Sequence, residues 1–476
     1  MKVVVLGAGF AGLAAAIALQ EKRHQVTLLE RRGVLGGRAT SYRDAPSGEE
    51  VDNGSHLMVG AYKDSLDLIR GAGAGDLLHE QENLHIDYVE DAGPTALRCP
   101  PLPAPLHLLA GLLSLRLPWS VRFQALRLGL AVRFGAPPHG LTLAEYFRRT
   151  GQGPQARRLL WDPLATAIVN EAPERAAAIL FHRVYQEAFL ASRKASRLVF
   201  LRCGWGPFAE RLAGYFEARG GTLRRRALVH AIETDGARVS CVRFTQGAEE
   251  RADIQAGRRA REERLPADAV VAAVPWHALP DLLPEGLRAE APFADLAKLR
   301  SSPIVSVELW LDRVVVPHVL VGLRDSEVEW VFDKGRLFGR AGSPQHLSFI
   351  VSAAYRSSPK PNAELLAAAV AALRRYYPAM SGASVTRSLV MREPEATFSA
   401  GPETEGLRPG PVTPLPGLFL AGDWTATGLP ATIEGAVRSG REAARVLTSS
   451  GHRAGLEGQS AIGDLGGTAD GAVFSI

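Results

Sequence analysis

Cysteine is scarce in this sequence. Its 476 residues include three cysteines, Cys99, Cys203 and Cys241, which lie far apart and form no CxxC motif. An odd number of widely separated cysteines excludes a disulfide framework and is consistent with the reducing cytoplasm. No two histidines stand in an HxxxH spacing and no Cys/His cluster occurs, so we predict no metal site.

Long apolar runs are also absent. Residues 99–115 carry no charge, but prolines crowd their start. The apolar part is much shorter than the roughly 20 residues that a membrane-spanning helix needs. We therefore expect no transmembrane helix from this segment.

Acidic residues are rare just after this apolar segment, although the net charge of the whole chain is only +5. Residues 101–160 contain one acid, Glu145, and eight arginines: Arg116, Arg122, Arg127, Arg133, Arg148, Arg149, Arg157 and Arg158. Two alternatives follow for a helix near residues 102–117. It lies on an anionic membrane surface, or it is buried with a solvated basic face. No nucleic-acid recognition module accompanies the arginines, so we expect no nucleic-acid partner.

Glycine, in contrast, is concentrated at the start of the chain in a nucleotide-binding motif. A predicted strand at residues 2–6 leads into Gly7-Ala8-Gly9-Phe10-Ala11-Gly12 and an alanine-rich helix to about residue 24. Gly7 allows the tight turn, Gly9 lets the backbone approach a pyrophosphate, and Gly12 lets helix and strand pack closely. The free N–H groups at the helix start would face the anion. These glycines also interrupt the apolar core that a secretory signal peptide needs.

An acid follows this motif at the expected distance. A second predicted strand, residues 25–30, ends in Glu30, which follows Gly12 by 18 residues and precedes Arg31. A carboxylate here would accept hydrogen bonds from ribose hydroxyls and argues against a 2′-phosphate, so NADP is not expected. A second glycine pair, Gly36-Gly37-Arg38, follows almost at once.

The remaining elements were predicted from hydrophobic periodicity and turn residues. Residues from about 86 to 200 are expected to be largely helical. Strands are predicted at 228–234 and 238–244 around Asp235-Gly236, and at 269–274, 304–311, 347–353 and 417–421. Helices are predicted at 208–219, 362–376 and 432–447.

This order of elements predicts two domains. One nucleotide-binding domain is expected to consist of residues 1–86, 200–288 and 389–447. The two insertions, residues 87–199 and 289–388, would form a substrate domain, and residues 448–476, rich in Gly, Ser and Ala, a flexible tail.

Four blocks of the sequence resemble flavin amine oxidases and carotenoid desaturases, in the same order and over nearly the whole chain. They are the opening motif, Gly36-Gly37-Arg38, residues 204–229 and residues 420–436. Within that superfamily, residues 52–62 and 422–436 are similar to hydroxysqualene dehydroxylases. The resemblance implies FAD as the cofactor and an α/β fold. Its Rossmann-like FAD-binding domain, with the GxGxxG and GG motifs, would carry an inserted α+β substrate domain.

The resemblance also implies residues that hold the dinucleotide. The turn Gly36-Gly37-Arg38 would lie against the FAD pyrophosphate, where the arginine supplies charge and several donors. The strand that contains Val229 would contact adenine through its backbone. Gly422-Asp423 would meet the ribitol and pyrophosphate region.

Other residues are implied near the flavin ring. Thr432-Ile433 begin the last helix, whose start would point at the flavin C2 carbonyl and N1 and favour the anionic reduced form. Gly54 and Ser55 match small residues beside the isoalloxazine face. His56 is a candidate general acid near neutral pH, or alternatively a histidine that hydrogen-bonds the backbone or the flavin. Asp52 is interpreted as a loop-anchoring acid.

The implied reaction is the reductive removal of a hydroxyl group. Reduced FAD would give a hydride to hydroxysqualene, an apolar C30 allylic alcohol, and loss of water would yield squalene for hopanoid synthesis. Hydroxide is a poor leaving group, so a general acid is required. Three other functions stay open: an FAD-dependent carotenoid desaturase, an amine oxidase, and a non-catalytic flavin-binding membrane scaffold. The expected location is the cytoplasm, with peripheral contact to the inner membrane surface as an option, and the oligomeric state is not indicated.

Overall fold

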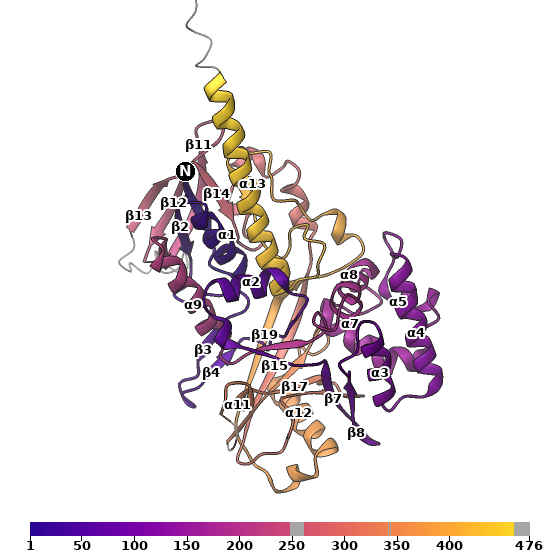
Figure 1. Ribbon diagram of the computed structural model, residues 1–476. Coiled ribbons are helices and arrows are strands. Elements are labelled where there is room, and N and C mark those ends of the chain that lie inside the picture. The colour runs from indigo at the N-terminus through magenta and orange to yellow at the C-terminus, as the bar shows by residue number, and fades with distance from the viewer. Residues whose placement is uncertain (248–260, 341, 343, 461–476) are drawn as a thin grey trace, which may run out of the picture.

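A five-stranded parallel sheet is built from segments that lie far apart in the sequence. In the computed structural model, which describes residues 1–247, 261–340, 342 and 344–460, the strand order is β10-β2-β1-β14-β20 (Figure 1). These strands are β10 (Thr222–Arg225), β2 (Gln25–Glu30), β1 (Lys2–Leu6), β14 (Ala269–Ala272) and β20 (Leu418–Leu420). The central strands are almost entirely buried and apolar, as expected of a parallel sheet that is covered on both faces.

Helices cover one face of this sheet. They are α1 (Phe10–Glu21), α2 (Lys63–Gly71), α9 (Trp205–Ala218) and α13 (Ile433–Ser460), with α13 running beside α1 (Figure 1). The two helices approach closely, since a Cβ on Gly440 would overlap the carbonyl oxygen of Ala11. The other face carries an antiparallel sheet of β11 (Ala227–Thr234), β12 (Val239–Gln246) and β13 (Arg261–Pro266). The layers are therefore helix, parallel sheet and antiparallel sheet.

A second sheet has seven strands in the order β19-β15-β18-β17-β16-β7-β8. They are β19 (Val385–Phe398), β15 (Ser301–Leu311), β18 (Gln345–Val351), β17 (Trp330–Asp333), β16 (Leu320–Leu323), β7 (His85–Glu90) and β8 (Gly93–Arg98). Helix α12 (Asn362–Tyr376) packs on one face, over residues such as Val307 and Phe349. Because side chains alternate along a strand, the intervening residues point to the other face. There they form an inner apolar cluster that includes Ile304, Trp330, Phe332, Ile350, Leu57 and Val59.

The helices between β8 and β9 gather on one side of the molecule (Figure 1). They are α3 (Leu106–Ser114), α4 (Trp119–Phe134), α5 (Leu143–Arg149), α6 (Pro154–Ala156), α7 (Asp162–Val169) and α8 (Ala178–Val184), with π-helical turns at Arg157–Trp161 and Tyr185–Leu190. None of the helices in the described part of the chain is both long and apolar enough to span a bilayer.

Short elements complete the fold. β3 (Ser41–Arg43) pairs with β4 (Glu50–Asp52), and β9 (Leu198–Leu201) lies between β5 (Met58–Val59) and β6 (Leu78–Glu80). Helix α11 (Lys334–Leu337) follows β17 directly.

Most of the predicted elements are confirmed to within a few residues, among them β1, β2, the β11–β12 hairpin and α12. One prediction was wrong: the start of the supposedly helical region forms the hairpin of β7 and β8. β7 pairs in parallel with β16, which lies far later in the chain, so long-range pairing decides this conformation. The predicted tail also begins too early, because α13 continues to Ser460; residues 461–476 lie outside the described residues.

Glu329, between β16 and β17, carries a carboxylate whose ionisation opposes folding. Burial raises the pKa of Glu329 to about 7, and its Oε2 has no hydrogen-bond partner among the described residues. Because the folded pKa exceeds the ordinary value of 4.5, the contribution of Glu329 to stability is most favourable below pH 4.5 and falls as the pH rises from 4.5 to about 7. We predict that Glu329→Gln raises the free energy of unfolding by about 2 kcal/mol at pH 8 and by much less at pH 5.

The control is Glu327→Gln, which removes a more exposed carboxylate that pairs with Lys360 at 2.6 Å. Denaturant unfolding of both variants at the two pH values measures the effect. An equal gain for Glu329→Gln at both pH values, or no gain at pH 8, would contradict this account.

Candidate functional site

The glycine-rich turn lies between β1 and α1, at the carboxyl end of the parallel sheet. Gly7 has a φ of 95°, and its N–H donates to the carbonyl of Leu29 at 2.8 Å. A Cβ on Gly12 would overlap the carbonyl oxygen of Gly7, so only glycine lets α1 pack on the turn. Gly9 caps α1 without a side-chain hydrogen bond, which leaves N–H groups of the first helical turn open to an anion.

The second glycine pair lies directly against this turn. Gly36 N–H donates to the carbonyl of Ala8 at 3.0 Å, and Gly9 forms a parallel bridge with Gly36. A Cβ on Gly37 would come within 3.2 Å of the Gly9 Cα. The two predicted motifs thus form one surface of bare backbone, which is the shape that close approach of a pyrophosphate requires.

Glu30 braces the same turn from the end of β2. Its carboxylate accepts hydrogen bonds from the N–H of Ala8 at 2.7 Å and of Arg32 at 2.8 Å. Arg31 beside it is exposed, and Val229 lies half-buried on β11. The N–H of Arg226, just before β11, donates to the carbonyl of Arg32 at 3.3 Å. Glu30 is therefore held at the place where the sequence predicts ribose recognition.

An ion pair joins the N-terminal motifs to the last strand. Arg38 pairs with Asp423, whose side chain is almost buried. Gly422 N–H donates to Ser439 Oγ of α13 at 2.8 Å, and the buried Arg408 donates to the carbonyl of Asp423 at 2.9 Å. Arg408 was not predicted as a site residue. Besides its neighbour Glu405, it contacts Asp423 and Thr427, which the fold brings beside it.

The start of α13 is fixed by two interactions. Thr432 Oγ1 accepts from the N–H of Gly435 at 3.0 Å and so caps the helix before Ile433. The buried Glu434 accepts from the N–H of Ser65 at 2.9 Å and of Asp64 at 3.1 Å, at the start of α2. The positive end of the α13 dipole is therefore rigidly held.

The turn around Gly54 connects the two sheets. Ser55 Oγ donates to Ser348 Oγ of the second sheet at 3.1 Å, and a Cβ on Gly54 would lie 3.8 Å from Ser306 Oγ. Asp52 accepts from Ser41 Oγ at 2.6 Å and from the N–H of Trp205 at 3.0 Å, and it pairs with the buried Lys334. These contacts agree with a loop-anchoring role for Asp52, and Lys334 is a partner that the sequence did not reveal.

His56 sits in a buried environment beside this turn. Its ring meets the Trp205 ring edge to face, with 5.5 Å between centroids, and its Nε2 has no partner among the described residues. Burial lowers the pKa of His56 to about 4, although Asp52 opposes the shift. The ring is therefore neutral near pH 7, which argues against a proton donor of the imidazolium type.

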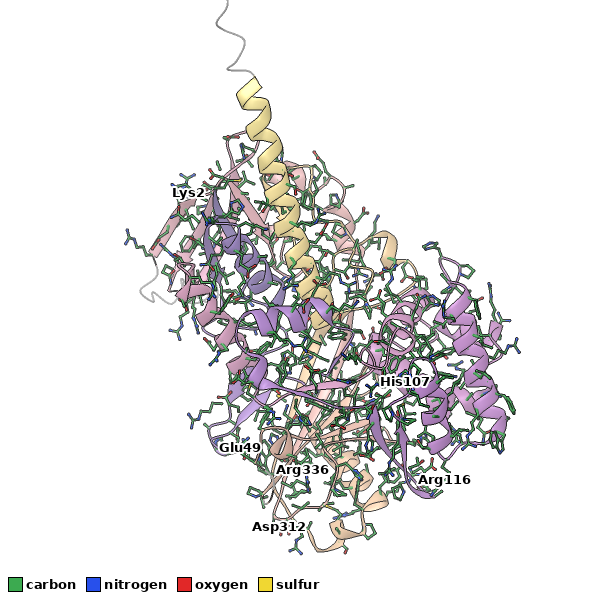
Figure 2. The ribbon with its side chains drawn as sticks, in the orientation of Figure 1. Lys2, Glu49, His107, Arg116, Asp312 and Arg336 are labelled. Atoms are coloured by element: carbon green, nitrogen blue, oxygen red, sulfur yellow. The ribbon has the colours of Figure 1, made fainter. Side chains whose placement is uncertain are left out.

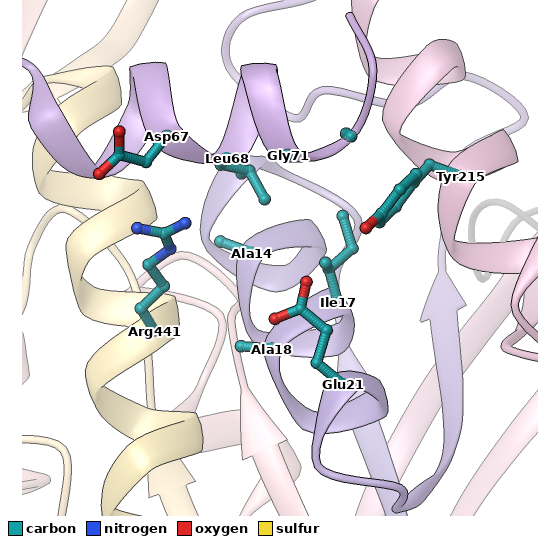
Figure 3. Close-up of a pocket in the computed structure, with 10 residues that line it drawn as sticks. Ala14, Ile17, Ala18, Glu21, Asp67, Leu68, Gly71, Tyr215 and Arg441 are labelled. Atoms are coloured by element: carbon teal, nitrogen blue, oxygen red, sulfur yellow. The ribbon is translucent and has the colours of Figure 1, made fainter.

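Figure 3 shows a different, small pocket on the helical side of the parallel sheet. It lies among α1, α2, α9 and α13 and has a volume of about 30 Å³. Such a volume holds about one water molecule. It is lined by residues such as Ala14, Asp67 and Arg441 and not by the glycine turns, so it is separate from the candidate site.

The sequence matches a known family, described as flavin containing amine oxidoreductase, over residues 10–448. The chain belongs to this family. It is 31% identical to the hydroxysqualene dehydroxylase of Rhodopseudomonas palustris, over 94% of this chain and 99% of that protein. It is 27% identical to the 15-cis-phytoene desaturase of Synechococcus elongatus, over 94% and 96% of the two chains. Cyclohexylamine oxidase from Brevibacterium oxydans shares the fold, with a TM-score of 0.68, 16% identity and coverage of 95% and 99%.

These similarities confirm three predictions: the fold class, FAD as the cofactor, and the resemblance to hydroxysqualene dehydroxylases. The protein is a flavin-dependent oxidoreductase. The bare glycine surface, the open start of α1 and the capped start of α13 fit such a dinucleotide.

Gly12 gives the sharpest test of the glycine surface. We predict that Gly12→Ala displaces α1 from the turn and abolishes copurifying FAD, measured as absorbance near 450 nm per mole of protein. Gly214→Ala, on an open face of α9, is the control, because no atom would lie within 4 Å of its Cβ. It should keep its FAD and gain up to about 1 kcal/mol of stability. Full FAD content in Gly12→Ala would contradict the packing argument.

Proposed function

We propose that this oxidoreductase removes the hydroxyl group of hydroxysqualene to give squalene, in squalene and hopanoid biosynthesis. The main support is its similarity, over 94% of the chain, to two proteins named hydroxysqualene dehydroxylase, at 31% and 30% identity. When reduced, FAD supplies the hydride that replaces the hydroxyl group.

The surroundings of the Gly54 turn suit an apolar substrate with one hydroxyl. The inner apolar cluster lies on the face of the second sheet that Ser55 contacts, and it includes Leu57 and Val59 just after the turn. On the same face, Ser306, Glu308 and Ser348 form a polar band. An apolar chain could therefore lie along the cluster with its hydroxyl group at the polar band.

We propose roles for the predicted site residues on the same basis. Gly7, Gly9, Gly12, Gly36 and Gly37 would admit the pyrophosphate. The contacts to the rest of FAD would come from Glu30, Arg31, Arg38, Val229, Gly422, Asp423, Thr432 and Ile433, with Gly54 and Ser55 beside the ring. His56, neutral because of its burial, would hydrogen-bond the flavin or the substrate without acting as the general acid.

The proposed domains follow from these roles. Residues 1–86, 200–288 and 389–447 would bind FAD, and residues 87–199 and 289–388 would enclose the substrate. This division assigns the parallel sheet to the cofactor and most of the second sheet to the substrate. Two strands of the second sheet, β7 and β19, cross the proposed boundaries.

Oxidative desaturation of a carotenoid precursor is the second candidate. It is favoured by the 27% identity to 15-cis-phytoene desaturase. The two reactions differ in direction, since a desaturase takes hydride from its substrate.

Product analysis distinguishes these functions. Anaerobically reduced enzyme should convert hydroxysqualene to squalene, detected by mass spectrometry, with one flavin oxidised for each squalene formed. The oxidised enzyme should leave phytoene and simple amines unchanged. Absence of squalene from fully reduced enzyme would refute the proposal, and flavin reduction by phytoene would establish the desaturase instead.

We also propose that α3 and α4 rest on an anionic membrane surface, with the protein otherwise in the cytoplasm. α3 buries His107 and Gly111 and exposes leucines. It therefore lacks the solvated basic face that a buried helix in this region was expected to have. α4 exposes a line of apolar side chains along one face: Trp119 (63% exposed), Phe123 (67%), Leu130 (50%) and Phe134 (80%). Arg116, Arg122 and Arg133 flank these residues and would meet anionic head groups.

Vesicle flotation tests this contact. We predict that the wild-type protein floats with vesicles containing anionic lipid, and that the double variant Trp119→Ser/Phe123→Ser does so at least tenfold less. Val412→Ser, which changes a residue that is 59% exposed elsewhere, should float like the wild type. Wild-type protein that stays at the bottom at every salt concentration would contradict the proposal.

A further inference from the structure

A continuous line of polar side chains runs from the surface to Ser55. Ser55 Oγ contacts Ser348 Oγ at 3.1 Å, and Ser348 Oγ donates to Glu308 Oε1 at 2.7 Å. Glu308 Oε2 lies 2.9 Å from His346 Nε2. Glu49 Oε2 lies 3.2 Å from His346 Nδ1, which is an ion-pair contact without hydrogen-bond geometry. We call these five residues the polar line.

The register of the second sheet creates this arrangement. Glu308 of β15 lies directly opposite Ser348 of β18, and His346 lies two residues along the same strand. Because side chains alternate, all three point away from α12 and toward the Gly54 turn. Their neighbours in sequence, such as Val307 and Leu347, are buried in the core under α12.

The interior of the polar line is shielded from water, whereas its outer end is not. Glu308 is 2% exposed and His346 and Ser348 are each 1% exposed, but the Glu49 side chain is 19% exposed. Figure 2 shows Glu49 near the outer edge of the molecule. A proton can therefore enter at one end and reach the other without an open water channel.

The imidazole of His346 is held between two acids. It stacks on the Trp310 ring with 4.1 Å between centroids and 13° between planes, which fixes the direction of both nitrogens. Burial opposes protonation, but the contacts with Glu308 and Glu49 raise the pKa of His346. Placing charged groups this deep opposes folding, and apolar residues at the same sheet positions would be at least as stable. This cost indicates a role other than packing.

A second observation marks the inner end of the polar line as a site for a ligand. Ser306 is 1% exposed, and its Oγ has no hydrogen-bond partner in the described part of the chain. It lies on the same strand face as Glu308, beside Gly54. A buried hydroxyl without a partner is costly, and a hydroxyl group of a substrate would satisfy it.

We propose that the polar line delivers the proton that leaves with the hydroxyl group of the substrate. This inference rests on the proposed dehydroxylation, which needs one proton and one hydride. The C–O bond breaks, its oxygen takes a proton from Ser55 and leaves as water, and the hydride from reduced FAD forms the new C–H bond. The two serine hydroxyls rotate and pass on a proton from Glu308, which is replenished through His346 and Glu49 from solvent. Glu308, His346 and Ser348 act through Ser55 and are positioning residues.

The test compares two leaving groups in single-turnover reactions of pre-reduced enzyme. The alcohol needs a proton to leave, whereas the acetate ester of the same alcohol does not. We predict that Glu308→Gln and Ser348→Ala each slow flavin oxidation by the alcohol at least tenfold. With the ester, both variants should stay within about twofold of the wild type.

Two comparison variants separate proton delivery from general damage. Glu171→Gln neutralises another fully buried carboxylate, which holds Tyr355 and Ser399 outside the polar line, and should keep the wild-type rate with both substrates. His56→Gln should change the rates with the alcohol and the ester by the same factor, because a neutral histidine that only binds flavin or substrate does not deliver the leaving-group proton.

The outcomes are distinct. Equal slowing of the alcohol and the ester, or no slowing of either, would overturn the polar line as the proton source. Loss of the alcohol reaction in His56→Gln with the ester reaction retained would assign the acid to His56. If the ester does not react with the wild type, the solvent isotope effect on flavin oxidation by the alcohol is measured instead. A wild-type rate that is at least twofold slower in D2O, with no such slowing in Ser348→Ala, supports the proposal. The same isotope effect in both proteins overturns it. Failure of wild-type enzyme to make squalene would refute the proposed function itself.

Discussion

The contact between two glycine backbones governs the arrangement of the site. Gly9 and Gly37 meet with no side chain between them, and Gly12 lets α1 sit on the carbonyl of Gly7. A Cβ at these places would move α1 away from β1 or the second turn away from the first. The braced Glu30, the Arg38–Asp423 pair and the start of α13 are all positioned relative to this surface. We propose that cofactor binding depends on this absence of side chains.

The two faces of the second sheet differ in polarity. The face under α12 is mainly apolar, with the buried pair Gln345 and Asp333 at one end. The opposite face passes from the inner apolar cluster to Ser306, Glu308 and His346. Buried acids and an imidazole destabilise a fold unless they are paired, and here each has a partner on a neighbouring strand or loop. The Gly54 turn joins this polar band to the glycine surface through Ser55. In the proposed function, this short segment would link cofactor recognition to substrate chemistry.

Sequence patterns predicted the local features of the protein well. The strand and helix around the opening glycines and the periodicity of residues 362–376 depend on neighbours in sequence, and the structure agrees with them. The β7–β8 hairpin was missed because its conformation depends on β16. Long-range contacts also explain why other residues were missed. The partners that distinguish them lie on other elements of the fold: Asp52 for Lys334, Ser348 and His346 for Glu308, and Asp423 for Arg408. His56 was found from its position after the Gly54 turn, but its neutral state follows from burial, which the sequence does not contain.

The account depends on one claim: that reduced flavin and a proton from the protein together replace a hydroxyl group by hydrogen. Isotope placement tests it most directly. Enzyme that has been reduced and equilibrated in D2O is mixed with unlabelled hydroxysqualene, and the position of deuterium in the product is read by mass spectrometry and NMR. The account predicts squalene with one deuterium, on the carbon that carried the hydroxyl group. Squalene without deuterium at that carbon, or deuterium scattered over several carbons, would contradict it.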